Sequence, residues 1–295
     1  MALNLLDAFD SSDLLSKEEK IKEQYLRAPI PYPGGKSRSV QYILPHLPYR
    51  DTYIEPFGGS AAVLLTRRVS KLEVYNDRYG GIVAFYRCIA NKEKCNALMD
   101  RLSITITSRE EFIWAKENWQ NVEDDVERAA LWFYIMNYSF AGLGRNFGRA
   151  VRGNGVMAGK VLGKLESFAK LHQRMEKVQV ENQDWFDCIK DYDHRESVIY
   201  CDPPYVDSHH GTYKHEMNHD DHRKFIDTVA HCKGFVAVSG YANPLYDNQN
   251  FWTGRYEWDS YVSISPRAFT EGNGKEDIKD VDTRVSAREV LWIKE

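Results

Sequence analysis

The sequence lacks the features of a membrane protein, a secreted protein or a protein stabilised by structural zinc. No apolar run approaches the roughly 18 residues that a membrane span requires, and the N-terminal stretch has no basic region followed by an apolar segment. The five cysteines are odd in number, widely spaced and never in a Cys-x-x-Cys pair, which favours reduced thiols over disulfides or zinc ligands. We therefore expect a cytoplasmic protein with no membrane contact and no metal.

The sequence also lacks an excess of positive charge. Its 39 Lys and Arg against 43 Asp and Glu give a formal net charge of −4, which argues against a uniformly basic nucleic-acid coat. A local basic patch is present between residues 145 and 177, where eight Lys and Arg stand against two Glu, a net charge of +6. With 295 residues and 43% apolar content, the chain suits one large globular domain or two small ones.

The order of the apolar runs predicts an α/β fold. The early chain alternates in the order strand 52–55, helix from 60, strand 72–75 and helix 82–89. Such alternation is typical of the start of a parallel sheet. Five later runs also predict strands, the last two at one edge: 178–180, 197–200, 235–239, 256–264 and 288–293. Before the strand at 235, Asn218 is a predicted helix N-cap and Gly234 a predicted C-terminal glycine.

Residues 86–175 interrupt this alternation. A strong helix is predicted over 123–140, and a Gly/Arg-rich segment follows it over 141–155. We therefore expect a charged lead-in over 1–27, an α/β domain assembled from 28–85 and 176–295, and an inserted domain over 86–175. The inserted domain carries most of the basic patch and is expected to face an anion.

The residues most indicative of chemistry are Asp202-Pro203-Pro204-Tyr205, directly after the apolar run 197–201. Two prolines cannot continue a central strand, so the chain is expected to turn at the strand's carboxyl end. Ligands bind there in open α/β sheets. A carboxylate beside a rigid carbonyl and an aromatic ring suits a planar substrate with an NH2 group, although a plain turn is the alternative on these residues alone.

Two glycine-containing turns are further candidates. Glycines in the turn over 55–62 would let a ligand approach the backbone at a helix N-terminus, and Asp77 ends the next strand, where an acid binds ribose hydroxyls. Residues 31–37 do not form a P-loop, because Ile30 stands where its first glycine belongs. The turn there still aims Lys36 at a carboxylate or phosphate. Purely structural turns are the alternative for both segments.

Histidines are concentrated in one stretch of the chain. Six of the nine fall between His209 and His231, yet their spacing matches no H-E-x-x-H arrangement and no cysteine pair accompanies them. We expect a polar loop here, and a histidine-rich metal hydrolase is the alternative.

Taken in order, these motifs resemble the S-adenosylmethionine-dependent DNA adenine-N6 methyltransferases of the Dam type. The resemblance covers nearly the whole chain and is carried by Tyr32-Pro-Gly-Gly-Lys36, Glu55-Pro-Phe-Gly-Gly59, Asn76-Asp77, the helix and loop over 130–146, Asp202-Pro-Pro-Tyr205 and Arg288-Glu-Val-Leu-Trp292. It implies a doubly wound, mostly parallel sheet of the Rossmann-like methyltransferase type. It also implies that the insert is a mainly helical DNA-recognition domain.

The resemblance implies S-adenosylmethionine as cofactor and double-stranded DNA as partner, and we expect a monomer. It places cofactor binding on Tyr32, Lys36, Phe57, Gly59, Asp77, Asp184 and Asp202. It places catalysis on Asp202, Pro203 and Tyr205. Where the family usually shows Phe-x-Gly-x-Gly, this chain has Ala61 in place of the second glycine.

Chemistry supports this assignment independently. The adenine amine is a poor nucleophile, and hydrogen bonds from it to Asp202 and the Pro203 carbonyl would favour charge building on nitrogen. The base must leave the duplex to reach them, and it is expected to stack on Tyr205. Cytosine-C5 transfer would instead need a nucleophilic cysteine, and the sequence has no Pro-Cys motif.

The basic patch is predicted to contact DNA. Arg pairs bidentately with guanine and Asn with adenine, so Arg145, Asn146 and Arg149 are predicted to help choose the sequence. The other predicted contacts, mostly to phosphate, are Arg152, Lys160, Lys164 and Lys170. A solvated basic surface is the alternative.

Other functions remain open on the sequence. Within enzymes, the alternatives are amino methylation of cytosine-N4 in DNA, of adenine in RNA or of a glutamine side chain. The resemblance implies Asp at the head of the motif for adenine in DNA, which Asp202 satisfies. A non-catalytic DNA-binding protein on the same scaffold is the alternative from another class, and it is disfavoured because Asp202, Lys36 and Asp77 are all retained.

Overall fold

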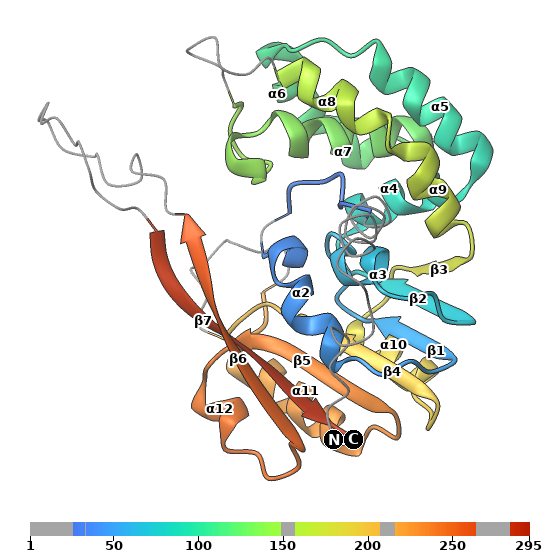
Figure 1. The fold of residues 1–295 in the computed structure, drawn as a ribbon. Coiled ribbons are helices and arrows are strands. Elements are labelled where there is room, and N and C mark those ends of the chain that lie inside the picture. Colours follow the sequence, from blue (N-terminus) through green and yellow to red (C-terminus); the bar gives the residue numbers. More distant parts are fainter. Residues whose placement is uncertain (1–25, 33, 149–156, 207–215, 264–283) are drawn as a thin grey trace, which may run out of the picture. The chain divides into compact units, whose positions relative to one another are not determined.

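The structure of the chain is a computed structural model that describes residues 26–32, 34–148, 157–206, 216–263 and 284–295 (Figure 1). Apart from its last two residues, the predicted lead-in over 1–27 lies outside the described residues. By their internal contacts the described residues form two compact units. Unit 1 draws on Met1–Val40, Gly59–Val69 and Gly80–Val180, and unit 2 on Gln41–Gly58, Ser70–Tyr79 and Glu181–Glu295.

A sheet of seven strands in the order β3-β2-β1-β4-β5-β7-β6 confirms the predicted α/β fold. Its strands are β1 (Thr52–Glu55), β2 (Leu72–Asn76), β3 (Val178–Glu181), β4 (Ser197–Cys201), β5 (Phe235–Tyr241), β6 (Gly254–Ser263) and β7 (Arg284–Lys294). β1 pairs in parallel with β2 and β4, and β4 pairs in parallel with β5. β7 is antiparallel to both β5 and β6, so the two C-terminal strands lie at one edge as predicted.

The register of the parallel strands brings their carboxyl ends to one edge of the sheet. Glu55 at the end of β1 lies opposite Tyr75, and Cys201 at the end of β4 lies opposite Val238. Because all of these strands run the same way, the loops that leave them begin from neighbouring points. Ligands of open α/β sheets bind at this edge, which makes the residues after these strands the first candidates for a functional site.

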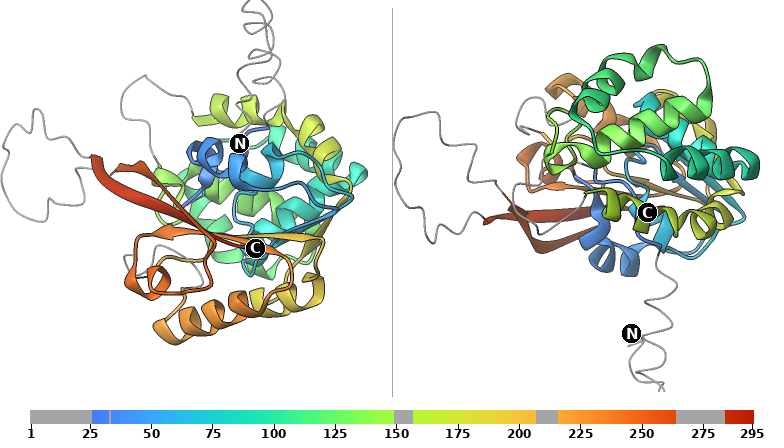
Figure 2. Two further views of the ribbon diagram at one scale, coloured as in Figure 1. Left: turned by 60° about the horizontal axis from the view of Figure 1, so that its bottom comes forward. Right: turned by 90° about the horizontal axis from the view of Figure 1, so that it is seen from above.

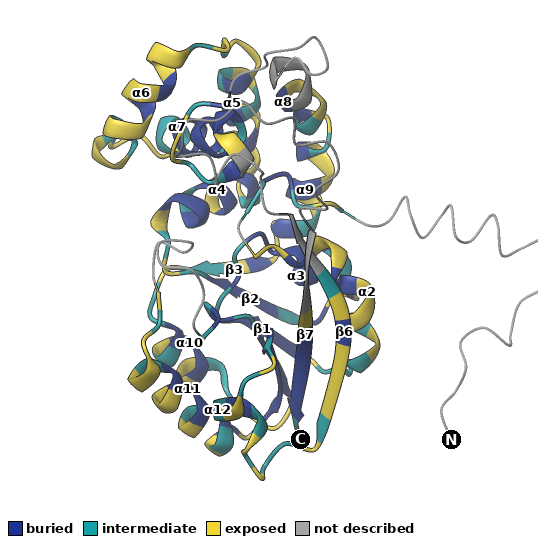
Figure 3. Ribbon diagram, turned by 90° about the vertical axis from the view of Figure 1, so that its left-hand side faces the viewer, coloured by how far each residue is buried: buried dark blue, intermediate teal, exposed yellow. Residues whose placement is uncertain are grey.

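Helices α10 (Trp185–Tyr192), α11 (His219–His231) and α12 (Pro244–Asp247) pack against the sheet within unit 2 (Figures 1 and 2). One buried cluster joins the helices to the strands, with members that include Ile54, Val74, Cys188, Ile199, Phe225, Val236 and Trp292. Figure 3 shows buried residues along the central strands, an exposed edge strand β6, and exposed outer turns of α10 and α11. Burial of both strand faces explains why the central strands are rich in apolar residues, with β4 and β5 the most apolar.

The prediction for α11 is right at its start and wrong at its end. Asn218 caps the helix and forms a capping box with Asp221. The helix ends at His231, and Gly234 does not take the left-handed conformation of a C-terminal glycine. Gly234 is needed for close packing instead, because a Cβ there would lie 2.1 Å from Ser197 Oγ.

The described part of unit 1 is mainly helical. Its helices are α3 (Ala62–Thr66), α4 (Gly80–Ala90), α5 (Lys92–Ser103), α6 (Arg109–Asn118), α7 (Asp125–Tyr138), α8 (Met157–Leu165) and α9 (Phe168–Met175). The predicted helix over 123–140 is α7, which packs against α4, α5 and α6. The rings of Phe85, Phe133 and Phe168 lie 5.3, 5.7 and 5.6 Å apart in the core of this unit.

Short helical turns complete the described secondary structure. They are η1 (Lys36–Arg38), α2 (Val40–Ile43), η2 (Leu44–His46), η3 (Trp119–Asn121) and η4 (Phe140–Gly142). Among the described helices, none is long and apolar enough to cross a membrane. The segment 86–175 lies within unit 1, and its role as a recognition domain stays a prediction.

All five cysteines are buried free thiols. Burial raises the pKa of Cys188 to about 12 and that of Cys201 well above its ordinary value. Because a nucleophilic cysteine must be a thiolate, these pKa values disfavour covalent catalysis by the cysteine nearest the candidate site.

Candidate active site

Asp202 lies at the carboxyl end of β4, immediately after its last residue. Its side chain is partly exposed, and its Oδ1 accepts a hydrogen bond from Ser239 Oγ of β5 at 2.8 Å. The Tyr200 hydroxyl in turn lies 2.9 Å from Ser239 Oγ. The predicted turn that presents a carboxylate at a strand end is therefore present, and the carboxylate is held by the neighbouring strand.

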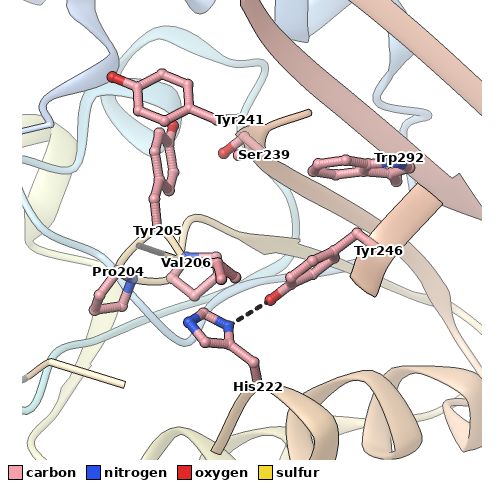
Figure 4. A pocket seen from close by; sticks show the side chains of 10 residues that line it. Pro204, Tyr205, Val206, His222, Ser239, Tyr241, Tyr246 and Trp292 are labelled. Carbon is pink, nitrogen blue, oxygen red and sulfur yellow. Dashed lines mark hydrogen bonds between the residues drawn. The ribbon is translucent and has the colours of Figure 1, made fainter. Parts of the chain in front are cut away.

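A pocket lies beside Asp202 within unit 2, with about 220 Å³ of empty space including open solvent. Residues 203–206 supply one wall and residues 239–241 of β5 another (Figure 4). His222, Tyr246 and Trp292 complete the lining, with His222 Nδ1 hydrogen-bonded to the Tyr246 hydroxyl at 2.8 Å. The lining is thus aromatic and apolar and lies next to a carboxylate, which suits contact with a flat heterocycle that carries an amino group.

Tyr205 is more buried than a ready stacking surface would be, with only 7% of it exposed. Its ring makes an edge contact with Tyr241, with centroids 4.5 Å apart and an interplanar angle of 73°. Burial raises the pKa of Tyr241, with smaller contributions from Glu289 and Asp202. The Tyr241 phenol therefore keeps its proton beside the carboxylate at ordinary pH.

The turn after β1 is tied to the end of β2 within unit 2. Gly58 N donates to Asn76 O at 2.7 Å, and a Cβ on Gly58 would lie 2.2 Å from the Tyr75 ring. Phe57 stacks at 6.0 Å on Trp185, the first residue of α10. The first glycine of this turn is therefore required by close approach to β2, and Phe57 is held beside the start of α10.

The turn continues in unit 1, where Gly59 lies against Tyr32. Gly59 has φ +46°, and a Cβ there would lie 3.2 Å from Tyr32 Cε1. Lys36 is buried, with 5% exposure, and its Nζ donates to Gly34 O at 2.9 Å in the turn that Gly34 and Gly35 form. The structure thus brings Tyr32 and Gly59 together and places Lys36 on η1, which packs against α3.

Ala61 replaces the family's second glycine and adopts the conformation that a glycine would. Its φ of +57° makes it the one non-glycine residue with positive φ in the part of the chain that the structure describes. This left-handed residue is the N-cap of α3. A side chain in this conformation costs about 1–2 kcal/mol, so strain is stored next to the predicted cofactor site.

Asp77 and Asp184 lie in the loops that follow β2 and β3. Asp77 Oδ1 accepts from Tyr79 N at 2.7 Å, and Asp184 caps α10 by accepting from Phe186 N at 3.0 Å. Asp184 also lies 3.5 Å from the Arg78 guanidinium. Both predicted cofactor contacts therefore have structural partners, and both remain partly or half exposed at the carboxyl edge.

The sequence placed Asn76 in a motif with Asp77 but gave it no role, and the structure supplies one. The Asn76 side chain is fully buried, and its Nδ2 donates to Pro56 O at 2.9 Å and to Gln183 O at 3.2 Å. Its Oδ1 accepts from Gln183 N at 2.9 Å. An asparagine at the end of an apolar strand, directly before Asp77, was the only signal available.

Two of the three predicted base-reading residues, Arg145 and Asn146, lie in a hairpin-like loop of unit 1. An antiparallel bridge joins Ser139 to Phe147, and Arg145 and Asn146 are exposed beside it. The Arg145 carbonyl accepts from Lys116 Nζ at 2.9 Å. The bridge agrees with the predicted loop or hairpin, while base reading itself stays a prediction.

The structure describes only some of the other predicted DNA contacts. Arg149 and Arg152 lie outside the described residues, as do the side-chain atoms of Lys160. The Lys164 ammonium is hydrogen-bonded to Asn137 Oδ1, whereas Lys170 is exposed.

The histidine-rich stretch forms no metal centre among the residues that the structure describes, where no group of three or more His, Cys, Asp or Glu side chains is arranged to hold an ion. His222 is buried against Tyr246, and His231 Nδ1 lies 2.7 Å from Asp227 O. His209, His210 and His215 lie outside the described residues.

The strand order and the carboxyl-edge site define an α/β protein of the Rossmann-like methyltransferase type. Residues 32–264 match the model of the D12 class N6 adenine-specific DNA methyltransferases. The chain belongs to this family, which confirms the resemblance found in the sequence.

Similar proteins carry matching names. The chain is 27% identical over 186 residues to a DNA adenine methylase of Salmonella typhi and to one of Escherichia coli strain K12, which covers 61% of this chain and 65% of each relative. It is 26% identical over 258 residues to a DNA N-6-adenine-methyltransferase of Escherichia phage P1, which covers 80% of this chain and 33% of the relative. The chain therefore spans less than two thirds of the relatives it matches.

Replacing Ala61 by glycine is expected to stabilise the protein. Glycine removes the left-handed penalty of about 1–2 kcal/mol but adds about 0.4–1 kcal/mol of chain entropy to the unfolded state, so the net gain is about 0.5–1 kcal/mol. Urea unfolding measures it. The same change at Ala129, in the middle of α7, should destabilise, and a loss of stability for Ala61→Gly would contradict the strain argument.

Proposed function

We propose that the protein transfers a methyl group from S-adenosylmethionine to the exocyclic N6 amine of a flipped-out adenine in a specific sequence of double-stranded DNA. The observation that carries this proposal is the Asp202 carboxylate, held by Ser239 at the carboxyl end of β4 beside Pro203 and the aromatic pocket. Membership of an adenine-specific family and the names of the relatives support the same activity.

The proposed chemistry is direct in-line transfer. S-adenosylmethionine, when bound, supplies an electrophilic methyl group on a sulfonium. Asp202 and the Pro203 carbonyl accept hydrogen bonds from the amine, which raises electron density on N6 as the N–C bond forms and the C–S bond breaks. Tyr205 stacks on the base, and N6 releases one proton in the course of the reaction. Positioning of the two reactants supplies much of the rate.

The residues at the carboxyl edge fit the cofactor that the family implies. The ribose hydroxyls would bind Asp77 and the adenine ring would contact Asp184, both partly exposed carboxylates that follow β2 and β3. Tyr32, Lys36, Phe57, Gly59 and Asp202 are the other proposed contacts. The fixed turn after β1, with its close backbone approach at Gly59, supports this assignment.

The basic loop is proposed to recognise the DNA. Arg145 and Asn146 would read base edges, together with Arg149, because they are exposed at a hairpin-like loop. Lys160, Lys164 and the exposed Lys170 would contact phosphates, and Arg152 is a further proposed DNA contact.

Replacing Asp202 by alanine is expected to lower the rate of methyl transfer by about 10²- to 10³-fold, because the amine loses an electrostatic partner in the transition state. The measurement is mass spectrometry of nucleosides after reaction with genomic DNA, which also identifies the methylated base. Asp191→Asn is the matched control, since it removes an exposed carboxylate from α10 of the same unit. N4-methylcytosine as the product, or a loss below tenfold, would refute the assignment.

Replacing Asp77 by asparagine is expected to weaken S-adenosylmethionine binding by about 10- to 100-fold, while DNA binding is unchanged. Asparagine keeps the oxygen that accepts from Tyr79 N but loses the charged acceptor for ribose hydroxyls. Isothermal calorimetry measures the affinity. Asp51→Asn, before β1 at the opposite end of the strand, should have no effect, and equal affinities for all three proteins would remove Asp77 from the site.

Arg145→Ala and Lys170→Ala are expected to affect DNA binding differently. The arginine change should cost about 1–3 kcal/mol on the preferred sequence only, whereas the lysine change should weaken binding to every duplex and lower the salt slope by about one. The preferred sequence comes from methylation sequencing of DNA exposed to the protein. Equal losses on preferred and random duplexes for Arg145→Ala would show that the loop only positions the DNA.

A further inference from the structure

A buried chain of two hydroxyl groups ends on the candidate catalytic carboxylate. The Tyr200 hydroxyl lies 2.9 Å from Ser239 Oγ, which donates to Asp202 Oδ1 at 2.8 Å. Tyr200 is 3% exposed and Ser239 1% exposed. Both belong to strands β4 and β5, and no motif in the sequence includes Ser239.

The direction of this chain follows from the number of protons. A carboxylate only accepts, so Ser239 uses its single proton on Asp202, and Tyr200 must then donate to Ser239. The Cys201 carbonyl lies 3.5 Å from the same Oγ and is the weaker acceptor, being both farther away and uncharged. Burial raises the pKa of Tyr200 well above its ordinary value, with a further contribution from Asp202, so the phenol keeps its proton.

We propose that Ser239, itself oriented by Tyr200, is a positioning residue that fixes the Asp202 side chain for its contact with the substrate amine. This inference rests on the proposed function. Asp202 is partly exposed at a strand end, where an aspartate without a fixed partner samples several rotamers. A hydrogen bond from a side chain locked in the sheet selects one rotamer, which is the alignment that a two-reactant transfer depends on.

The hydrogen-bonded pair of Tyr200 and Ser239 hydroxyl groups is poorly suited to carry away the proton that N6 releases. It leads from the pocket into the buried interior, because both hydroxyl groups belong to side chains in the sheet. Each already holds a proton, and deprotonated Tyr200 is disfavoured by burial. The two hydroxyl groups therefore orient the carboxylate, and the proton departs toward solvent.

The test compares Ser239→Ala, Tyr200→Phe and the double variant at saturating DNA and cofactor. Loss of a hydrogen bond to a charged group should lower kcat about 10- to 100-fold in Ser239→Ala, and Tyr200→Phe should cost less, about 3- to 10-fold. Because Tyr200 acts only through Ser239, the double variant should be no slower than Ser239→Ala. KM for both substrates should stay within about twofold in every case.

Two matched variants separate positioning from folding. Ser197→Ala removes another fully buried serine hydroxyl from β4, one that donates only to the His194 carbonyl, and it should leave kcat unchanged. Ser239→Thr keeps the hydroxyl and should retain most of kcat. Crystal structures give a readout that needs no activity, since Asp202 should occupy more than one rotamer in Ser239→Ala and a single rotamer in Ser197→Ala.

Three results would overturn the inference: a kcat within twofold of wild type for Ser239→Ala, losses that multiply in the double variant, or one unchanged Asp202 rotamer without the Ser239 hydroxyl. Failure of the proposed function is a different result, in which the wild-type protein transfers no methyl group to DNA adenine. In that event the rotamer comparison still decides whether Ser239 positions Asp202.

Discussion

The fully buried side-chain amide of Asn76 holds together the loops on which the proposed cofactor contacts depend. It bonds to Pro56 O in the loop after β1 and to both backbone groups of Gln183 in the loop after β3. Separately, the backbone carbonyl of Asn76 accepts a hydrogen bond from Gly58 N. The Pro56 and Gln183 backbone groups would be left without this partner if the side-chain amide were lost, at about 1–3 kcal/mol apiece when buried. One side chain therefore sets the spacing between the turn at Phe57 and the loop that leads to Asp184.

The substrate half of the site is built differently. There a strand side chain, Ser239, bonds to the side chain of Asp202 across the β4–β5 pair, whose register places Cys201 opposite Val238. In both halves a polar side chain is buried in the sheet and paired, an arrangement that rigidifies a site when every member has a partner. The parallel strands fix where the loops begin, and these two buried groups fix where they go.

The sequence predicts the strands and the Asp202 turn because the spacing of apolar residues and the positions of proline and glycine determine the backbone over only a few residues. The predictions of β1, β2 and the Asn218 cap rest on local signals of this kind, and the structure confirms them. The roles of Asn76 and Ser239 could not be predicted, because their partners lie far away in the sequence and come together only after folding. Gln183, for example, lies 107 residues beyond Asn76. Gly234 misled for a related reason, since a glycine forced by contact with Ser197 looks in sequence like one that ends a helix.

The buried state of Tyr205 places a demand on DNA binding. If a base stacked on this ring in place of Tyr241, the protein would lose an edge contact worth about 0.5–1.5 kcal/mol. Stacking on an aromatic side chain returns about 1–3 kcal/mol, so the exchange is favourable by only about 1 kcal/mol. Flipping a paired base costs a few kcal/mol. Under the proposed function, the aromatic pocket therefore cannot drive extrusion of the base alone. Most of the driving force would come from contacts to the DNA made elsewhere, for which the basic patch over 145–177 is the candidate.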